Sequence, residues 1–345
     1  MKKYLLPENG TFYKANLHCH TNISDGKLSP AEVKELYMAH GYSIVAYTDH
    51  EVLIPQHENL SDEHFLALNA HELEVIEPGN GAEHKTRQRC HMCIIALEPD
   101  NVKQTCWHRS KYLWGNAVTH RDEVQFDETL PDYVRAYSAK GVNDVIRRAR
   151  AAGFWVTYNH PVWSLEDPEQ FLKYEGFNAL EIYNHGCVVN GFDDDVPQIY
   201  DNFLKKGTRI FCVADDDNHC NRPAGHPRHD ACGGFTMIKA DKLEYRTITK
   251  AMEAGNFYAS NGPLIHELWF EDGMVHVKCD PAARIVANYG VVRTERIYAE
   301  EVEGELTEMA FSVKPNDVYI RITVYAADGK HAYTNAYFAD ELYAD

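Results

Sequence analysis

The chain has 345 residues, with 52 acidic side chains against 34 lysines and arginines and a formal net charge of −18. So acidic a protein lacks the basic surface that binds duplex DNA or an anionic membrane, and we expect neither partner. The composition, 44% apolar and 25% charged, is that of a globular protein able to build a core. The length favours two domains, or one large barrel with an appendage.

Targeting signals are lacking in the sequence. No apolar run approaches eighteen residues, so no membrane span is predicted, and residues 1–10 do not resemble a signal peptide. The nine cysteines are odd in number and scattered, which favours reduced thiols over a disulfide framework. We therefore expect a cytoplasmic protein.

Short β-type runs alternate with helical patterns over the first 260 residues, which predicts βα units around a parallel sheet. Ser29-Pro30-Ala31-Glu32 is a capping box with proline at the first helical position, and Gly41 ends that helix. The predicted strands are 12–20, 43–48, 65–69, 91–97, 154–158, 179–183 and 209–214, and the later helices are 142–152, 197–206 and 243–254. This order favours an α/β fold, a distorted (β/α) barrel, over a sandwich.

The sequence changes character at Gly262-Pro263. Short alternating runs separated by turn signals follow, with 318–325 as the best strand, and predict a small antiparallel β domain over 263–345 after a barrel over 1–262. Within the barrel, residues 100–137 match neither helix nor strand. So long a connection in a compact domain is usually a lid or a binding loop.

Histidines and carboxylates recur where predicted strands end. His18 and His20 share one face of the first strand, because alternate side chains of a strand point the same way. The other candidates are Asp25, Asp49-His50, Glu72, His91, Asn159-His160, Asp217 and His219. Side chains at the carboxyl ends of barrel strands converge on one mouth, and imidazole with carboxylate is the ligand set of hydrolytic zinc, manganese or iron sites.

These motifs, in this order, resemble those of the PHP (polymerase and histidinol phosphatase) family over about residues 12–262. The resemblance implies a (β/α)7 barrel with two or three divalent metal ions and a small C-terminal β domain. Carried over by motif, it implies one metal held by His18, His20, Glu72 and Asp217, a second by Glu72, His91 and His160, and a third by Asp25, His50 and His219. The family often has glycine two residues before the bridging glutamate, where this chain has Ala70, so Glu74 and His71 stay alternatives to Glu72.

The implied ligands suit hydrolysis of phosphate esters. Two metals roughly 3.5–4 Å apart can share a hydroxide and clamp both oxygens of an in-line displacement at phosphorus. We therefore expect a metal-dependent phosphoesterase acting on a small organic phosphate or short nucleotide, with zinc, manganese or iron. Asp25 or His219 would protonate the leaving oxygen if the third metal site is empty.

Residues around the predicted metal centre have expected supporting roles. Asp49 and Asn159 would orient ligands without binding metal. Arg222 is the preferred phosphate-binding cation among the candidates Lys85, Arg87, Arg109, Arg121 and Arg222. His185 would contact substrate or satisfy its own loop, and Trp163 would stack on a base or serve packing. Cys90 and Cys93 are interpreted as buried thiols rather than a redox pair.

Two other functions remain open from the sequence. A hydrolase of the same fold could cut a carbamate or aryl ester, and the aromatic-rich 100–137 segment would suit an apolar leaving group. A non-enzymatic module that holds metal or senses a ligand is the third hypothesis. A proofreading nuclease is disfavoured by the net charge of −18. Oligomeric state is left open.

Overall fold

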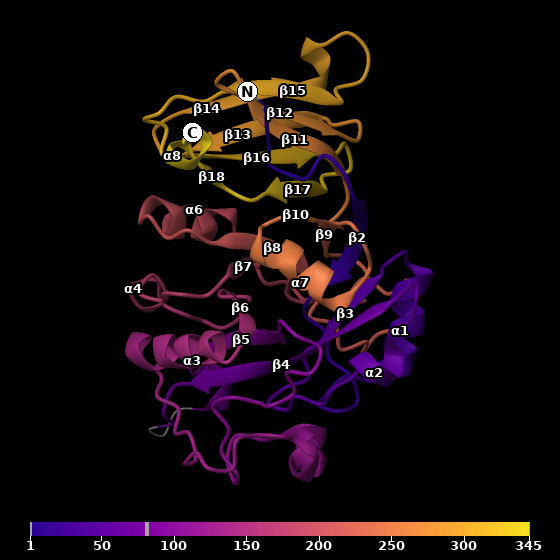
Figure 1. Cartoon of the computed structure of the whole chain (residues 1–345), viewed down its shortest axis with the longest axis vertical. Coiled ribbons are helices and arrows are strands. Elements are labelled where there is room, and N and C mark those ends of the chain that lie inside the picture. The colour runs from indigo at the N-terminus through magenta and orange to yellow at the C-terminus, as the bar shows by residue number, and fades with distance from the viewer. Residues whose placement is uncertain (1, 80–82, 345) are drawn as a thin grey trace.

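The structure is a computed structural model that describes residues 2–79 and 83–344, so the first residue of the expected barrel and the last of the expected β domain lie outside the described residues. No helix within these ranges is both long and apolar enough to cross a membrane. The C-terminal strands, orange to yellow in Figure 1, lie at one end of the molecule. The connection 97–138, in magenta, lies at the opposite end.

A large mixed sheet runs through the molecule. In spatial order its strands are β14 (Thr294–Tyr298), β13 (Arg284–Tyr289), β16 (Tyr319–Tyr325), β17 (His331–Thr334), β10 (Phe257–Ser260), β9 (Phe235–Ala240), β2 (Thr11–Asn16), β3 (Ile44–Tyr47), β4 (Leu66–Ile76), β5 (Arg89–Ala96), β6 (Phe154–Tyr158), β7 (Ala179–Asn184) and β8 (Phe211–Asp215), with β18 (Tyr337–Phe338) beside β16. All seven strands predicted in the first part of the chain are present, β6 with the predicted ends and the other six with shifted ends. The mixed α/β class is therefore confirmed.

The prediction of a wholly parallel sheet is wrong at two strands. β2, β3 and β4 run parallel, and so do β6, β7 and β8, but β5 is antiparallel to both β4 and β6. Residues 77–88 join β4 to β5 and have no α-helix among the described positions. A parallel crossover is usually made by an α-helix, and without one this connection returns the chain as the antiparallel neighbour of β4. β9, which the sequence reading did not identify, is antiparallel to β2.

The first and last of the seven strands from β2 to β8 come close together just past their carboxyl ends. Past the strand ends, the N–H of Asp217 donates to the carbonyl of His18 at 3.0 Å, and the N–H of His20 donates to that of Asn218 at 3.0 Å. No ladder links β8 to β2 among the described residues, so a closed barrel is not confirmed and stays a prediction.

The helices are α1 (Pro30–Ala39), α2 (His57–Leu60), α3 (Ala139–Ala151), α4 (Pro168–Phe171), α5 (His185–Val189), α6 (Pro197–Lys205), α7 (Tyr245–Glu253) and α8 (Ala339–Leu342), with 3-10 turns η1 (His84–Thr86), η2 (Gly115–Glu123) and η3 (Ala299–Glu301). The capping box of α1 is confirmed, since Ser29 accepts from the Glu32 N–H at 3.3 Å and the Glu32 carboxylate from the Ser29 N–H at 2.8 Å. Gly41 follows with a φ of 78°, which glycine adopts at little cost.

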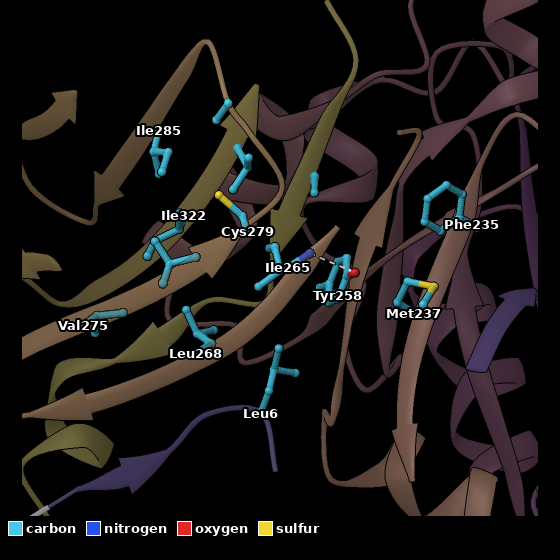
Figure 2. Packing of buried hydrophobic residues seen from close by; sticks show 14 of the residues in the cluster. Leu6, Phe235, Met237, Tyr258, Ile265, Leu268, Val275, Cys279, Ile285 and Ile322 are labelled. Carbon is cyan, nitrogen blue, oxygen red and sulfur yellow. Dashed lines mark hydrogen bonds between the residues drawn. The ribbon is translucent and has the colours of Figure 1, made fainter. Parts of the chain in front are cut away.

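A second, smaller sheet lies in the C-terminal part of the molecule. Its strands, in spatial order, are β1 (Lys3–Tyr4), β11 (Ile265–Glu271), β12 (Met274–Cys279) and β15 (Glu308–Ser312). Figure 2 shows the apolar cluster there, in which Leu6 from the N-terminal segment joins Leu268 and Val275. The Ile265 N–H donates to the Tyr258 hydroxyl at 2.9 Å (Figure 2). Because β10 pairs with β17 and β1 with β11, ladders cross the expected boundary at residue 262, and that boundary stays a prediction.

A buried carboxyl after β6 gives the fold a testable pH dependence. Glu166 accepts from the hydroxyls of Tyr137, at 3.1 Å, and Tyr174, and burial raises its pKa to about 7. Because the folded state holds this proton more tightly than the unfolded chain, the stabilisation is complete below about pH 4.5 and is lost as pH rises through about 7. The loss is about 3 kcal/mol.

We expect Glu166→Gln, which cannot ionise, to flatten the fall in the free energy of unfolding between pH 5 and pH 8 in urea titrations. Glu169→Gln, on the exposed surface three residues away, is the control and should keep the wild-type slope. An unchanged slope in Glu166→Gln would contradict the prediction.

Candidate metal centre

The backbone brings the candidate residues to one end of the sheet. Isolated bridges pair His50 with Glu72, His91 with Asn159, and Cys19 with Asn218, so the segments that carry the candidates are in register with one another. His160 and Asp217 have φ angles of 26° and 50°, in the left-handed region that costs a non-glycine residue about 1–3 kcal/mol. Such strain is characteristic of functional sites.

The carboxylate of Glu72 lies at the centre of the cluster and is fully buried. Five imidazoles surround it: Oε1 is 3.0 Å from His91 Nδ1 and 3.2 Å from His18 Nε2 and His160 Nε2, and Oε2 is 3.0 Å from His50 Nδ1 and 3.4 Å from His20 Nε2. A second carboxylate lies beside it, with Asp217 Oδ1 3.0 Å from His20 Nε2 and 3.3 Å from His18 Nε2. The two Nε2 atoms of His18 and His20 are only 3.1 Å apart.

All nine predicted metal ligands come together. Four overlapping groups have donor atoms within 4.8 Å of one another: His20, Asp25, His50 and His219; His18, His160 and Asp217; His18, His20 and Glu72; and His50, Glu72 and His91. The grouping differs in detail from the implied one, since His20 joins Asp25 and His219, and His50 shares Glu72 with His91. Their roles as ligands remain a prediction.

The two alternatives to Glu72 differ in position. Glu74 Oε2 lies 3.1 Å from His91 Nε2, on the side of that ring away from Glu72. His71 is fully buried near Phe154, and its ring nitrogens have no hydrogen-bond partner. Burial lowers the pKa of His71 to about 3. Neither residue belongs to any of the four donor groups, which favours Glu72.

The donor set fits a divalent cation. His20 Nδ1, His50 Nδ1 and Glu72 Oε2 are buried without a hydrogen bond of normal geometry, although His50 Nδ1 and Glu72 Oε2 lie only 3.0 Å apart. Burial would raise the pKa of Glu72, but the surrounding imidazoles hold it well below its ordinary value. Burial likewise lowers the pKa of His20, yet the carboxylates of Asp217 and Glu72 beside its ring raise it to about 10. Positive charge among these carboxylates is therefore favourable. A bound metal ion would supply it, and the histidines would release their protons when the metal binds.

A buried glutamate supports the cluster from behind. Glu181 Oε1 lies 2.9 Å from His18 Nδ1, and its Oε2 accepts from the backbone N–H of His160 at 3.0 Å and from Asn184 Nδ2 at 2.9 Å. A carboxylate on the far nitrogen of a metal-binding histidine fixes its tautomer and orientation. The sequence reading missed Glu181, and its one signal is an acidic residue inside the otherwise apolar run 179–183.

Asp49 and Asn159 contact the surroundings of the site. The Asp49 carboxylate accepts from the N–H and hydroxyl of Thr21, both at 2.8 Å, and from the hydroxyl of Ser24 at 2.8 Å. It therefore positions the turn that carries Asp25 rather than its sequence neighbour His50. Asn159 Nδ2 lies 3.3 Å from Glu72 Oε1 and 3.0 Å from the Sγ of Cys93. Cys90 and Cys93 are both buried and unpaired.

A cavity of about 890 Å³ opens above the cluster. Trp163 lines it, whereas Arg222 and His185 do not. Arg222 is exposed on a surface loop, and His185 turns toward the hydroxyl of Tyr183, 3.1 Å from its Nδ1. His185 thus contacts its own loop, which is the alternative left open for it, and the phosphate-binding role of Arg222 stays a prediction. The path of each loop, which the sequence does not reveal, directs both side chains away from the cavity.

The arginines that line the cavity are Arg89 and Arg135, which the sequence reading did not single out. Arg89 lies two residues before His91 on β5, so both side chains share one face of the strand. That spacing was a usable signal. Arg135 comes from the irregular connection 97–138, where no periodicity indicates direction.

Comparisons with known proteins give distant likenesses. No family model matches the chain, and a search of curated proteins found no significant match. A two-domain protein from Bacteroides vulgatus, containing a predicted PHP-like metal-dependent phosphoesterase, is 14% identical, with a TM-score of 0.44 over 97% of this chain and 98% of that one.

Two other solved structures match a smaller share of the chain. A protein from Bifidobacterium adolescentis assigned as a metal-dependent phosphoesterase is 16% identical, with a TM-score of 0.41 over 71% of this chain and 97% of its own. An amidohydrolase from Chromobacterium violaceum, with bound sulfate and no metal, is 16% identical, with a TM-score of 0.40 over 70% and 96%. These values are too low to assign a function, which is therefore argued from this chain's own residues.

Proposed function

We propose that this chain is a metal-dependent hydrolase, a phosphoesterase of PHP type that cleaves small organic phosphate mono- or diesters or short nucleotides. One observation carries the proposal. Five buried imidazoles converge on the Glu72 carboxylate at the base of a cavity large enough for an organic substrate. Clefts with such clusters of perturbed titratable groups are typical of catalytic sites.

The residues present would hold two or three divalent ions of zinc, manganese or iron. His18, His20, Glu72 and Asp217 would hold the first, Glu72, His91 and His160 the second, and Asp25, His50 and His219 a third. Bound there, the ions would supply Lewis-acid chemistry, polarising a phosphoryl oxygen and lowering the pKa of a water molecule.

The pair Asp25–His219 has a role of its own. His219 Nε2 lies 3.2 Å from Asp25 Oδ2, and both residues line the cavity. If the third metal site is empty, this pair can hold a proton facing the substrate and donate it to the leaving oxygen. Glu181 meanwhile keeps the His18 ring oriented toward Glu72 and Asp217.

The architecture that goes with this function is a (β/α)7 barrel over residues 1–262, followed by a small β domain over 263–345. The bonds that join His18 and His20 to Asp217 and Asn218 across the strand ends support closure of the barrel. We also propose a cytoplasmic location, supported by nine unpaired cysteines, since thiols stay reduced there.

A carbamate or aryl ester is the alternative substrate. Trp114, Trp163 and Phe192 line the cavity, and an apolar wall suits an aryl leaving group on carbon as well as on phosphorus. The metal centre alone does not separate these two electrophiles, so the assay must include both.

The test is a metal analysis of the purified chain together with an activity screen. We expect two or three ions per chain, and hydrolysis of phosphomonoesters or diesters that chelation abolishes and added zinc, manganese or iron restores. Faster turnover of aryl carbamates than of aryl phosphates would favour the alternative. Bound metal without turnover of any ester would contradict the proposed hydrolase and favour a non-enzymatic module that holds metal. A chain that binds no metal would also overturn the proposal.

A further inference from the structure

Beyond the histidine cluster, the wall of the cavity is aromatic. Tyr112, Trp114, Trp163 and Phe192 line it. Trp114 is 41% exposed and Phe192 is 38% exposed, although aromatic side chains gain much from burial. Exposed aromatic surface gathered in a concave site is characteristic of ligand contact.

Trp114 is held in place despite its exposure. Its ring centroid lies 4.6 Å from that of His50. The next residues fasten the loop. The Asn116 N–H donates to the Ser24 carbonyl at 3.0 Å, and Gly115 has a φ of 55°, where a Cβ would lie in tight contact with the Ser24 oxygen at 3.2 Å. The loop thus presents a fixed indole to the cavity.

Trp163 lies on the other side of the central carboxylate. Its ring centroid is 5.3 Å from that of His91 and 5.0 Å from that of His160, the rings beside Glu72 Oε1. Trp114 instead contacts His50, the ring beside Glu72 Oε2. The backbone N–H of Trp163 donates to Asp194 at 2.8 Å, which fixes the start of this loop. The two indoles therefore lie on different sides of the cluster, Trp163 near the rings that contact Glu72 Oε1 and Trp114 near the ring that contacts Glu72 Oε2.

We propose that Trp114 and Trp163 form an aromatic clamp that selects phosphoesters carrying a planar aromatic ring, such as a nucleobase. The inference rests on the proposed function for the phosphate and adds the recognition of the organic part. The cavity of about 890 Å³ is near the upper end of the 300–1,000 Å³ typical of ligand sites, which leaves room for a ring beside a phosphate. The Arg89 guanidinium, 5.3 Å from the Trp163 ring, adds a cation to the same wall.

A matched pair of ligands isolates the ring. We would measure calorimetrically the binding of phosphonate analogues of adenosine 5′-monophosphate and ribose 5-phosphate, whose C–P bonds resist hydrolysis, to the metal-loaded chain. The two differ only at C1′, which carries adenine in one and a hydroxyl in the other. We expect the adenosine analogue to bind at least about tenfold more tightly, the range expected for stacking on one aromatic side chain.

The variants should separate the two ligands further. Trp114→Ala and Trp163→Ala are each expected to weaken adenosine binding about tenfold and ribose binding less than about twofold, with metal content unchanged. Trp114→Phe should keep most of the preference. Trp269→Ala, on β11 and outside the cavity, is the matched control and should leave both affinities unchanged.

Equal affinity of the wild type for both analogues would overturn the clamp. Equal losses for both ligands, or loss of metal from Trp114→Ala and Trp114→Phe alike, would also overturn it, since the indole would then act by supporting His50. Base-dependent binding without hydrolysis of any ester would support the clamp while refuting the proposed function.

Discussion

Replacing Glu72 with glutamine is expected to remove bound metal and hydrolytic activity together, with a fall in kcat/KM of about 10³-fold or more. Substitution of residues that only support a metal ligand costs about 10–100-fold, and Glu72 contacts the rings of five candidate ligands directly. An amide removes the negative charge and turns an N–H₂ donor toward nitrogens that should face a cation. Metal per chain, by plasma mass spectrometry, and steady-state kinetics measure the two effects.

Glu74→Gln is the matched control, because Glu74 lies two residues further along β4 on the same face and also contacts His91. Its carboxylate is 3.4 Å from Arg89 Nη1 and belongs to no donor group. We expect this variant to keep its metal and to lose no more than about 10–100-fold in activity. The reverse result, with metal lost only from Glu74→Gln, would move the bridging role to Glu74, as the alanine at position 70 allowed.

Sequence alone could predict much of the site because its residues sit where apolar runs end. His50 lies three residues past the buried strand β3, and His18 and His20 alternate just past the end of β2, so local patterns indicate both their place and their direction. His91 lies in the predicted strand 91–97, whereas Glu72 was expected after the predicted strand 65–69 and in fact lies within β4, which extends to Ile76. Because the carboxyl ends of neighbouring parallel strands meet at one edge of the sheet, these residues can be expected to converge without knowledge of side-chain packing.

What the sequence could not provide depends on long-range packing. Glu181 and Arg135 act through partners 163 and 84 residues away, His18 and Glu51, and no local pattern encodes those distances. Arg222 lies three residues past His219, but proximity along a loop does not determine where its side chain points. The reversed direction of β5 was missed for the same reason, since an apolar run has no polarity of its own.

The ion pair of Arg135 with Glu51 fastens the irregular connection 97–138 to the core. Nη1 and Nη2 of Arg135 lie 2.6 Å from the two carboxylate oxygens of Glu51, and the side chains are 5% and 2% exposed. Nη1 also donates to the Glu74 carbonyl at 2.6 Å, and the guanidinium stacks 4.2 Å from the Tyr112 ring. The pair therefore joins the segment that presents Trp114 to the strand that carries Glu72.

Arg135→Met is expected to lower the free energy of unfolding by about 3–5 kcal/mol, because it leaves the Glu51 carboxylate buried without a counter-charge. Adding Glu51→Gln removes that charge and should restore most of the loss, whereas Arg109→Met, in the same connection but paired with Asp132 at 40% and 36% exposure, should cost at most about 1 kcal/mol. Urea titrations of the four chains give these values. If the free energy of unfolding of Arg135→Met is within about 1 kcal/mol of the wild-type value, the prediction is wrong. The connection is then held by its apolar contacts, and the ion pair serves only the shape of the cavity.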